Sequence, residues 1–333
     1  MSLPHSDLRV SALINWLSNS LSLDIQQLEI ASSDASFRRY FRVKCPSGCH
    51  IVMDAPPDKE NTEPFLRIAA LFKAANLRVP DIYFTNIEQG FIALEDFGSS
   101  SLLDCLAAKN VDQLYQQALQ SLLQLQTSID INKCALPTYD TLLLERELGV
   151  FHDWFLENLL GLVLPVGIKN DLHDILIQSA LAQPQVCVHR DYHSRNLMLI
   201  NSCELGIIDF QDAVIGPISY DAASLLRDCY IRWPTEQVDN WIYQYYLQLI
   251  QTQLLAVDFG QFKRWFDLMG LQRHLKAIGI FSRLHLRDGK SAYLDDIPRT
   301  LSYISEVCAN YAELSEFNRY LQQQIAPIYR SAL

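Results

Sequence analysis

Asp191, Asn196 and Asp209 carry side-chain oxygens at the ends of short apolar runs in the sequence. One run, 186–188, leads towards Asp191, and another, 197–200, directly follows Asn196 and precedes the strand that ends at Asp209. Short buried strands would hold these polar groups at one edge, where burying them unpaired is unfavourable. Mg²⁺ prefers carboxylate and amide oxygens. The spacing therefore predicts a site in which the amide and one of the carboxylates hold Mg²⁺ against a phosphate chain, while the other carboxylate orients a hydroxyl nucleophile.

The stretch resembles the catalytic core of the eukaryotic-like kinase superfamily, whose catalytic loop reads H-R-D-x-x-x-x-N. Here the loop is His189-Arg190-Asp191 with Asn196, and the metal aspartate opens Asp209-Phe210-Gln211. The resemblance implies that Asn196 and Asp209 hold Mg²⁺ and that Asp191 orients the hydroxyl nucleophile. The glutamine in place of the D-F-G glycine, the following run 216–221 and the lack of an A-P-E triplet resemble the aminoglycoside-phosphotransferase-like kinases of small molecules. The alternatives are an accidental triplet in a core loop and a zinc site at His189 and His193, which lacks the usual neighbouring glutamate.

Asp221 is expected to support this loop rather than to meet the substrate. It closes the Gly216–Asp221 run, which resembles the G-x-x-x-x-D continuation of the same branch. We expect its carboxylate to accept hydrogen bonds from the loop backbone or from His189, so that His189 and Asp221 together fix the shape of the site.

Composition excludes several other classes of protein. The 333 residues carry a net charge of −11, which argues against binding to nucleic acid or to an anionic membrane. Eight cysteines occur without a C-x-x-C pair, no secretion signal begins the sequence, and the longest apolar stretch, 159–168, is interrupted by Pro165. The expectation is a cytoplasmic protein with free thiols and a small-molecule partner, whose oligomeric state is not predicted.

The first hundred residues suggest a small antiparallel sheet. Strands are expected at 28–31, 39–44, 51–54, 79–85 and 90–94, with a helix over 62–76. The small polar turn after the first strand resembles the hairpin with which kinases cover a nucleotide, and the segment 95–98 resembles their hinge. The resemblance implies that the residues contacting the nucleotide, ATP or GTP, are Ser33, Ala35, Ser36, Arg38, Glu95 and Phe97.

Asp54 is the largest departure from the kinase pattern, which has a phosphate-binding lysine on this strand. Either another base (Arg38, Arg39 or Lys44) contacts the phosphates, or the nucleotide is held differently, or activity is lost. The run 53–57, M-D-A-P-P, together with 35–40, resembles bacterial anomeric sugar kinases of cell-wall recycling. That subgroup phosphorylates N-acetylmuramate and N-acetylglucosamine at C1.

The second part of the chain is helical by periodicity. Helices are expected over 111–128, 140–160, 171–181, 237–256, 260–287 and 298–325. Glu147 and Arg227 are the predicted substrate contacts, and the alternative for the polar helix face that carries Glu147 is a solvated surface. Arg227, Arg232 and Arg273, in runs that resemble the same sugar kinases, could bind a carboxylate or form internal ion pairs.

The sequence therefore predicts an α+β, bilobal protein-kinase-like fold, with a nucleotide-covering lobe at 1–96 and a helical catalytic lobe at 97–333. The predicted reaction moves the γ-phosphoryl group of ATP, with Mg²⁺, to the anomeric hydroxyl of N-acetylmuramate or N-acetylglucosamine in peptidoglycan recycling. The alternatives are an aminoglycoside or other amino-alcohol kinase and a non-catalytic nucleotide sensor.

Overall fold

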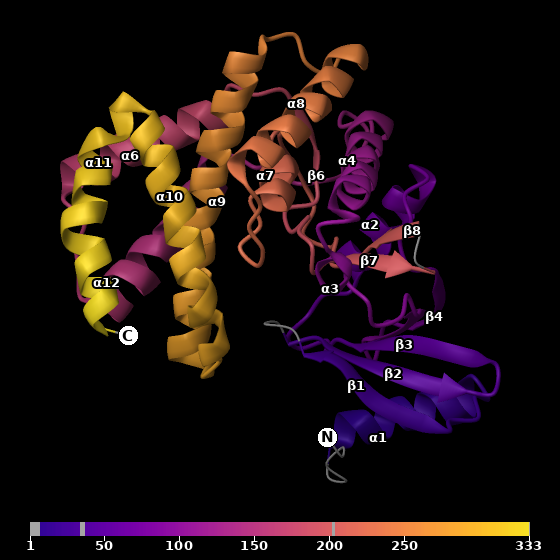
Figure 1. Cartoon of the computed structure of the whole chain (residues 1–333). Helices are drawn as coiled ribbons and strands as arrows, with labels where there is room; N and C mark the ends of the chain where they lie inside the picture. Colours follow the sequence, from indigo (N-terminus) through magenta and orange to yellow (C-terminus); the bar gives the residue numbers. More distant parts are fainter. Residues whose placement is uncertain (1–6, 34–36, 202–203, 333) are drawn as a thin grey trace. The chain divides into compact units, whose positions relative to one another are not determined.

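Two compact units make up the chain, for which a computed structural model describes residues 7–33, 37–201 and 204–332 (Figure 1). One unit combines Met1–Ser100 with Met198–Gln211, and the other combines Ser101–Leu197 with Asp212–Leu333. The first holds an antiparallel sheet and the second is mostly helical, as the α+β prediction required. The strand pair that follows the catalytic loop thus belongs largely to the unit that contains the sheet.

The sheet of the first unit has five antiparallel strands in the order β1-β2-β3-β5-β4. The predicted strands are present, although the fourth begins later than expected because Pro80 has no N–H to donate to a ladder. The strands are β1 (Gln27–Ser33), β2 (Arg39–Cys45), β3 (Gly48–Asp54), β4 (Ile82–Asn86) and β5 (Phe91–Glu95).

Helix α1 (Leu8–Asn15) and the π-helical turn η1 (Trp16–Ser20) cover one face of this sheet. Asp7 caps α1 by accepting hydrogen bonds from two backbone amides of its first turn. The buried cluster joins Val10, Leu13, Trp16 and Leu17 of the helix to Phe41, Val43, Val52, Phe91 and Ala93 of the strands. Burial of each large side chain contributes about 2 kcal/mol, so this layer holds α1 on the sheet.

Helix α2 (Glu63–Ala74) and the strand pair β7 (Leu197–Ile200) and β8 (Glu204–Ile207) complete the first unit. Phe65 and Phe72 of α2 pack on Phe210, with ring centroids 5.0 and 5.7 Å apart. Gly206 of β8 lies against the Phe97 ring, which a Cβ would approach to 2.4 Å. These contacts fix the segments on either side of Asp209 within the unit.

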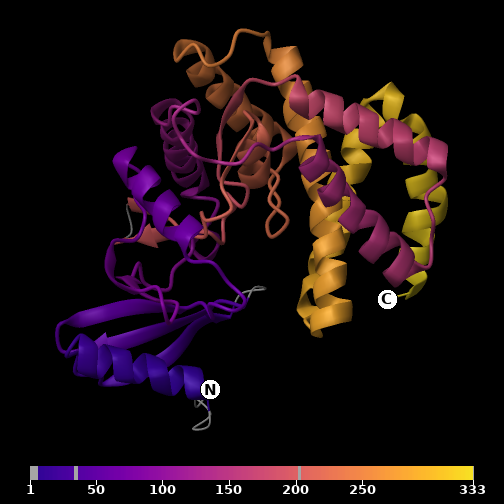
Figure 2. The same ribbon diagram turned by 180° about the vertical axis from the view of Figure 1, so that it is seen from behind.

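The second unit is built around α9 (Phe259–Asp288), which packs against several other helices and runs beside α10 (Ile297–Asn310) in both views (Figure 2). The other helical segments are α3 (Leu102–Cys105), α4 (Val111–Ser128), α5 (Thr141–Val150), η2 (Phe151–Leu159), α6 (Val166–Leu181), α7 (Tyr220–Leu226), α8 (Thr235–Gln251), η3 (Ser291–Asp296), η4 (Ala312–Leu314), α11 (Ser315–Tyr320), η5 (Leu321–Ile325) and α12 (Ala326–Ala332).

The helix predicted over 140–160 changes from α to π geometry at Val150. Gly279 of α9 lies against this junction, where a Cβ would stand 2.5 Å from the Val150 carbonyl oxygen. The missing side chain lets α9 pack directly on the backbone, a contact that periodicity alone does not reveal.

Strand β9 (Val214–Pro217), which the sequence did not predict, pairs antiparallel with β6 (Gln185–Val188). This pairing brings the start of the catalytic loop beside the segment that leads to Asp221. The described cysteines are free thiols, as expected. Among the helices of the described residues, none has the length and apolar character needed to cross a membrane.

Candidate active site

Asp221 holds the backbone of the catalytic loop from the first turn of α7. Its buried carboxylate accepts hydrogen bonds from the amides of His189, at 2.7 Å, and Arg190, at 3.0 Å. Arg190 has a φ of +76°, an unfavourable region for a side chain of this size, so the loop needs such an anchor. Burial raises the pKa of Asp221 to about 7, and the two amide donors act in the opposite direction.

Asp191 lies at the bend that this anchor creates. Its amide donates to Nδ1 of His189 at 3.3 Å, and its carbonyl accepts from Nδ2 of Asn196 at 3.0 Å. Burial raises the pKa of Asp191, but the positive charge of Lys276 leads the opposing effects and brings the pKa below its ordinary value. The carboxylate is therefore ionised at neutral pH, which is the state that accepts a proton or a hydrogen bond from a hydroxyl.

A cavity of about 130 Å³ opens beside Asp191 within the second unit. Its walls include the cations Arg227, Arg273 and Lys276 and the aromatic rings of Tyr230 and Phe281. Charged donors together with apolar ring faces suit a small polar molecule that has both hydroxyl groups and a flat apolar face. Most of the cavity comes from the end of α7 and from α9, far downstream of the catalytic loop in sequence.

Glu147, a predicted substrate contact, lies behind this wall and does not line the cavity. Its buried carboxylate accepts from Arg190 at 2.5 Å, Lys276 at 2.7 Å, Tyr139 at 2.5 Å and Gln272 at 3.1 Å. Burial raises the pKa of Glu147, but Lys276 and Arg190 outweigh that effect and lower it to about 2. Glu147 thus balances the charge of two cations of the site.

The three arginines proposed for carboxylate binding have different surroundings. Arg227 lines the cavity but donates to the buried Asp267 at 2.5 Å. Arg232 does not line the cavity and pairs with Glu306 on α10. Arg273 lines the cavity and donates to the Arg190 carbonyl at 2.6 Å.

Asp228 is a residue of the site that its sequence context did not reveal. It lines the cavity and accepts from the amide of Ser194 at 2.9 Å and the hydroxyl of the same residue at 2.5 Å. Its second oxygen accepts from the amide of Tyr230 at 2.9 Å. Asp228 therefore fixes the far end of the catalytic loop as Asp221 fixes the near end. One feature of the sequence could have identified Asp228: it directly follows Arg227 in a run that resembles the sugar kinases.

Asp209 is described within the first unit. Gln211, which replaces the glycine of D-F-G, donates from Nε2 to Oδ1 of Asp209 at 2.8 Å. Asp209 itself has a φ of +62°, and Phe210 is buried between aromatic rings of α2. The departure at Gln211 thus has a local purpose, since its amide orients the carboxylate of the predicted metal ligand.

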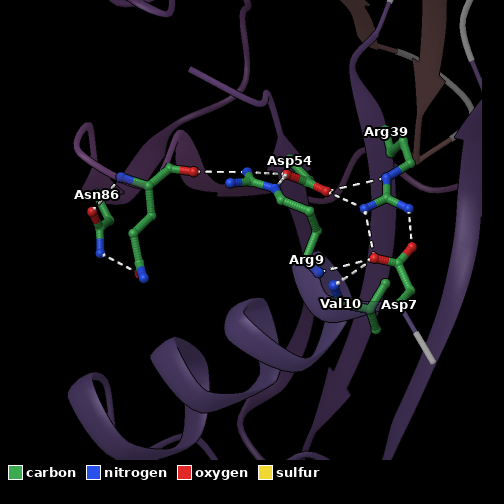
Figure 3. Close-up of polar contacts among 7 residues, drawn as sticks. Asp7, Arg9, Val10, Arg39, Asp54 and Asn86 are labelled. Atoms are coloured by element: carbon green, nitrogen blue, oxygen red, sulfur yellow. Dashed lines mark hydrogen bonds and ion pairs between the residues drawn. The ribbon is translucent and has the colours of Figure 1, made fainter. Parts of the chain in front are cut away.

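Asp54 is fully buried between two arginines, as Figure 3 shows. Arg9 donates from Nε at 3.0 Å, and Arg39 donates from Nε at 3.1 Å and from Nη2 at 2.5 Å. Arg39 also pairs with Asp7. Because Asp54 stands opposite Arg39 on one side and Phe91 on the other, its side chain lies on the sheet face that α1 covers. The acid in the lysine position therefore anchors α1.

This anchoring role gives a stability prediction. Asp54→Ala should lower the free energy of unfolding of the first unit by about 2 kcal/mol, because the arginines keep partial exposure and can rehydrate. Urea unfolding followed by fluorescence of Trp16, the one tryptophan of this unit's sequence, measures the change in a protein whose other tryptophans are replaced by Phe. The exposed Glu88→Ala is the matched control, and equal midpoints for the two variants would refute the role.

The predicted nucleotide contacts are only partly visible. Ala35 and Ser36 lie outside the described residues, and Ser33 ends β1. Nε of Arg38 donates to Glu60 at 3.2 Å. Glu95 accepts from Arg78 at 2.5 and 2.7 Å, and the same guanidinium lies 4.7 Å from the centre of the Phe97 ring. The side chains of Glu95 and Phe97 thus both contact Arg78, which leaves a nucleotide role at these two residues to the backbone.

Comparison with solved structures supports the fold. The choline kinase LicA from Streptococcus pneumoniae has a TM-score of 0.65 at 13% identity, and the match covers 89% of this chain and 99% of the LicA chain. The Plasmodium vivax ethanolamine kinase Pv091845 has a TM-score of 0.64 at 14% identity, covering 99% and 91%. At such identities the likeness concerns the fold alone, and it confirms the predicted kinase-like architecture.

Sequence relatives are much closer. A protein of Pseudomonas putida named N-acetylmuramate/N-acetylglucosamine kinase is 40% identical over 336 aligned positions, covering 96% of this chain and 98% of the relative. One of the same name from Neisseria meningitidis is 39% identical, covering 91% and 92%. A profile described as "Phosphotransferase enzyme family" matches residues 27–254. The chain therefore belongs to the phosphotransferase enzyme family, in the group of relatives that bear the name N-acetylmuramate/N-acetylglucosamine kinase.

Proposed function

We propose that the protein transfers the γ-phosphoryl group of ATP to the anomeric hydroxyl of N-acetylmuramate and N-acetylglucosamine, as a step of peptidoglycan recycling. The observation that carries this proposal is the cavity beside Asp191. The relative of Pseudomonas putida that is named N-acetylmuramate/N-acetylglucosamine kinase, at 40% identity, supports the choice of acceptor. Donors and aromatic walls suit a sugar, whose hydroxyls need partners and whose ring faces are apolar.

Asp191 is the proposed partner of the reacting hydroxyl. Its pKa lies below the ordinary value, so it is a weak base. The anomeric hydroxyl is the most acidic hydroxyl of a sugar, and phosphoryl transfer has a loose transition state, so positioning and a hydrogen bond from the hydroxyl are sufficient. Direct in-line transfer requires no covalent intermediate on the protein.

Asn196 and Asp209 are the proposed ligands of Mg²⁺, which would neutralise charge on the phosphates when bound. Nδ2 of Asn196 donates a hydrogen bond to the Asp191 carbonyl. This bond orients the side-chain amide so that Oδ1 faces away from that carbonyl. Gln211 orients the Asp209 carboxylate in the other unit. An amide oxygen and a carboxylate are each hard oxygen donors of the kind that Mg²⁺ prefers, and this ion usually keeps several waters besides.

The turn residues Ser33, Ala35 and Ser36 with Arg38 are the proposed cover of the nucleotide phosphates, and the backbone of Glu95 and Phe97 is the proposed contact of the base. Small residues let the backbone approach phosphates closely. Asp54 does not argue against nucleotide binding, because it anchors α1. ATP and GTP are both candidate phosphoryl donors. Measuring the half-saturating concentration of each nucleotide shows which one the protein prefers.

The contact between Gln211 and Asp209 gives a prediction about metal dependence. Gln211→Ala should raise the half-saturating Mg²⁺ concentration about 10-fold, because residues that orient a metal ligand contribute this much to metal affinity. The rate at saturating Mg²⁺ should stay within a few-fold of wild type. Gln323→Ala, an exposed amide change in the other unit, is the control. An unchanged Mg²⁺ curve for Gln211→Ala would contradict the proposed role of Asp209.

An aminoglycoside or amino-alcohol kinase is the second candidate, because solved structures with similar folds include choline and ethanolamine kinases. The cavity disfavours it. Cationic acceptors need facing carboxylates, whereas three basic side chains line this wall and Asp228 is engaged by Ser194 and Tyr230.

ATP consumption should be measured with N-acetylmuramate, N-acetylglucosamine, glucose, choline and kanamycin. Turnover with the two acetylated sugars is expected; turnover with kanamycin or choline alone, or ATP binding without turnover, would reject the proposal.

A further inference from the structure

Arg273 differs from the other strong cations of the cavity in its surroundings. Lys276 donates to Glu147 at 2.7 Å and Arg227 donates to Asp267 at 2.5 Å, so each has a buried carboxylate as its partner. No described carboxylate lies within ion-pairing distance of Arg273. The positive charge of Arg273 is thus the one among these three side chains that the protein does not pair directly.

The guanidinium of Arg273 is nevertheless held in one place. Nη1 donates to the Arg190 carbonyl at 2.6 Å, and Nη2 donates to Oγ of Ser224 at 2.7 Å. Its Cζ atom lies over the ring of Tyr220, 4.5 Å from the ring centre. These contacts are neutral, so they orient the group without neutralising its charge. A cation fixed before the ligand arrives loses little entropy on binding.

The position of Arg273 relates it to the acceptor. It contacts the residue immediately before Asp191 and lines the same cavity. An acceptor whose reacting hydroxyl meets Asp191 therefore has other parts of its ring beside Arg273. A guanidinium held in this way favours a carboxylate, which it can bind through two parallel hydrogen bonds.

We infer that Arg273 binds the carboxylate of an acidic amino sugar and so sets the preference for N-acetylmuramate over N-acetylglucosamine. The inference rests on the proposed function. The two sugars share the acetamido ring and differ by the lactyl ether, which carries the carboxylate. A residue that binds that group alone affects one substrate and spares the other.

The test compares three acceptors in wild type, Arg273→Gln and Arg273→Lys: N-acetylmuramate, its methyl ester and N-acetylglucosamine. Arg273→Gln should lower kcat/KM for the acid about 10- to 100-fold relative to N-acetylglucosamine, the range for a hydrogen bond to a charged group. Acid and ester should then react alike. Arg273→Lys should recover part of the preference. Taking ratios within one variant removes any general effect of the lost contact with the Arg190 carbonyl.

Arg232→Gln is the matched control, because Arg232 pairs with Glu306 and does not line the cavity; the ratio between substrates should be that of wild type. In wild type, the acid should exceed its ester by a similar factor, a comparison that needs no folded variant. Equal losses of Arg273→Gln on all three acceptors, or equal rates of wild type on acid and ester, would overturn the carboxylate role in an active enzyme. Absence of turnover of either sugar by wild type would instead overturn the proposed function and the inference together.

Discussion

Asp191→Asn is expected to lower kcat for sugar phosphorylation about 1,000-fold, within the range for loss of a group that takes or orients the reacting proton. Asparagine has the same shape but cannot accept the proton. The backbone contacts of Asp191 with His189 and Asn196 use the amide and carbonyl, so they survive the change. Nucleotide affinity, measured by calorimetry with a non-hydrolysable ATP analogue, should remain within a few-fold of wild type.

The matched control for this variant is Asp153→Asn, at an exposed carboxyl on η2 that does not line the cavity. It should retain wild-type kcat. If Asp191→Asn also retained kcat within a few-fold, Asp191 would not be the partner of the hydroxyl. A parallel loss of nucleotide binding would place Asp191 in the nucleotide site instead.

Asp221→Ala is expected to affect both stability and activity. It removes the acceptor of two buried amides, each of which costs about 1–3 kcal/mol when unsatisfied, so the free energy of unfolding should fall by about 4 kcal/mol. Arg190, at a φ of +76°, would lose its anchor, and kcat should fall by orders of magnitude. Chemical denaturation measures the first effect and initial rates the second. A variant as stable as wild type would show that the loop shape does not depend on Asp221.

The pKa of Asp221 adds a pH dependence to the same position. Burial raises this pKa from 3.8 to about 7, so the folded protein holds the proton more tightly than the unfolded chain. The contribution of this proton to the free energy of unfolding is fully present below the pKa of the unfolded chain. It is lost as the pH rises through about 7, the pKa of Asp221 in the folded protein. Asp221→Asn does not titrate, so wild type should lose stability relative to this variant between about pH 4 and about pH 7. A constant difference would contradict the raised pKa.

The linear spacing of the catalytic loop was informative because its partners lie close in sequence. The apolar runs around Asp191 predicted buried strands, and the antiparallel strands of the first unit followed from alternating residues and short turns. The role expected of Asp221 required the pairing of β6 with β9 to bring the two segments together. That pairing was not predicted, because four residues with a glycine and a proline give a weak strand pattern.

The walls of the site could not be predicted in the same way. Helical periodicity shows that Arg273 and Lys276 share a face of α9, but it does not show which other helix that face meets. Glu147 illustrates the limit, since its polar helix face suggested substrate or solvent and it proved to be buried against Lys276 and Arg190. The side of the sheet on which Asp54 lies likewise depends on the register with Arg39 and on the docking of α1.

Phosphorus NMR of the reaction product tests the central claim most directly. Purified protein is incubated with N-acetylmuramate or N-acetylglucosamine, ATP and Mg²⁺, and ADP is quantified in parallel. The account predicts one new phosphate signal coupled to the anomeric proton, formed in equal amount to ADP. Phosphate on a different hydroxyl, or ADP formed without any sugar phosphate, would contradict it.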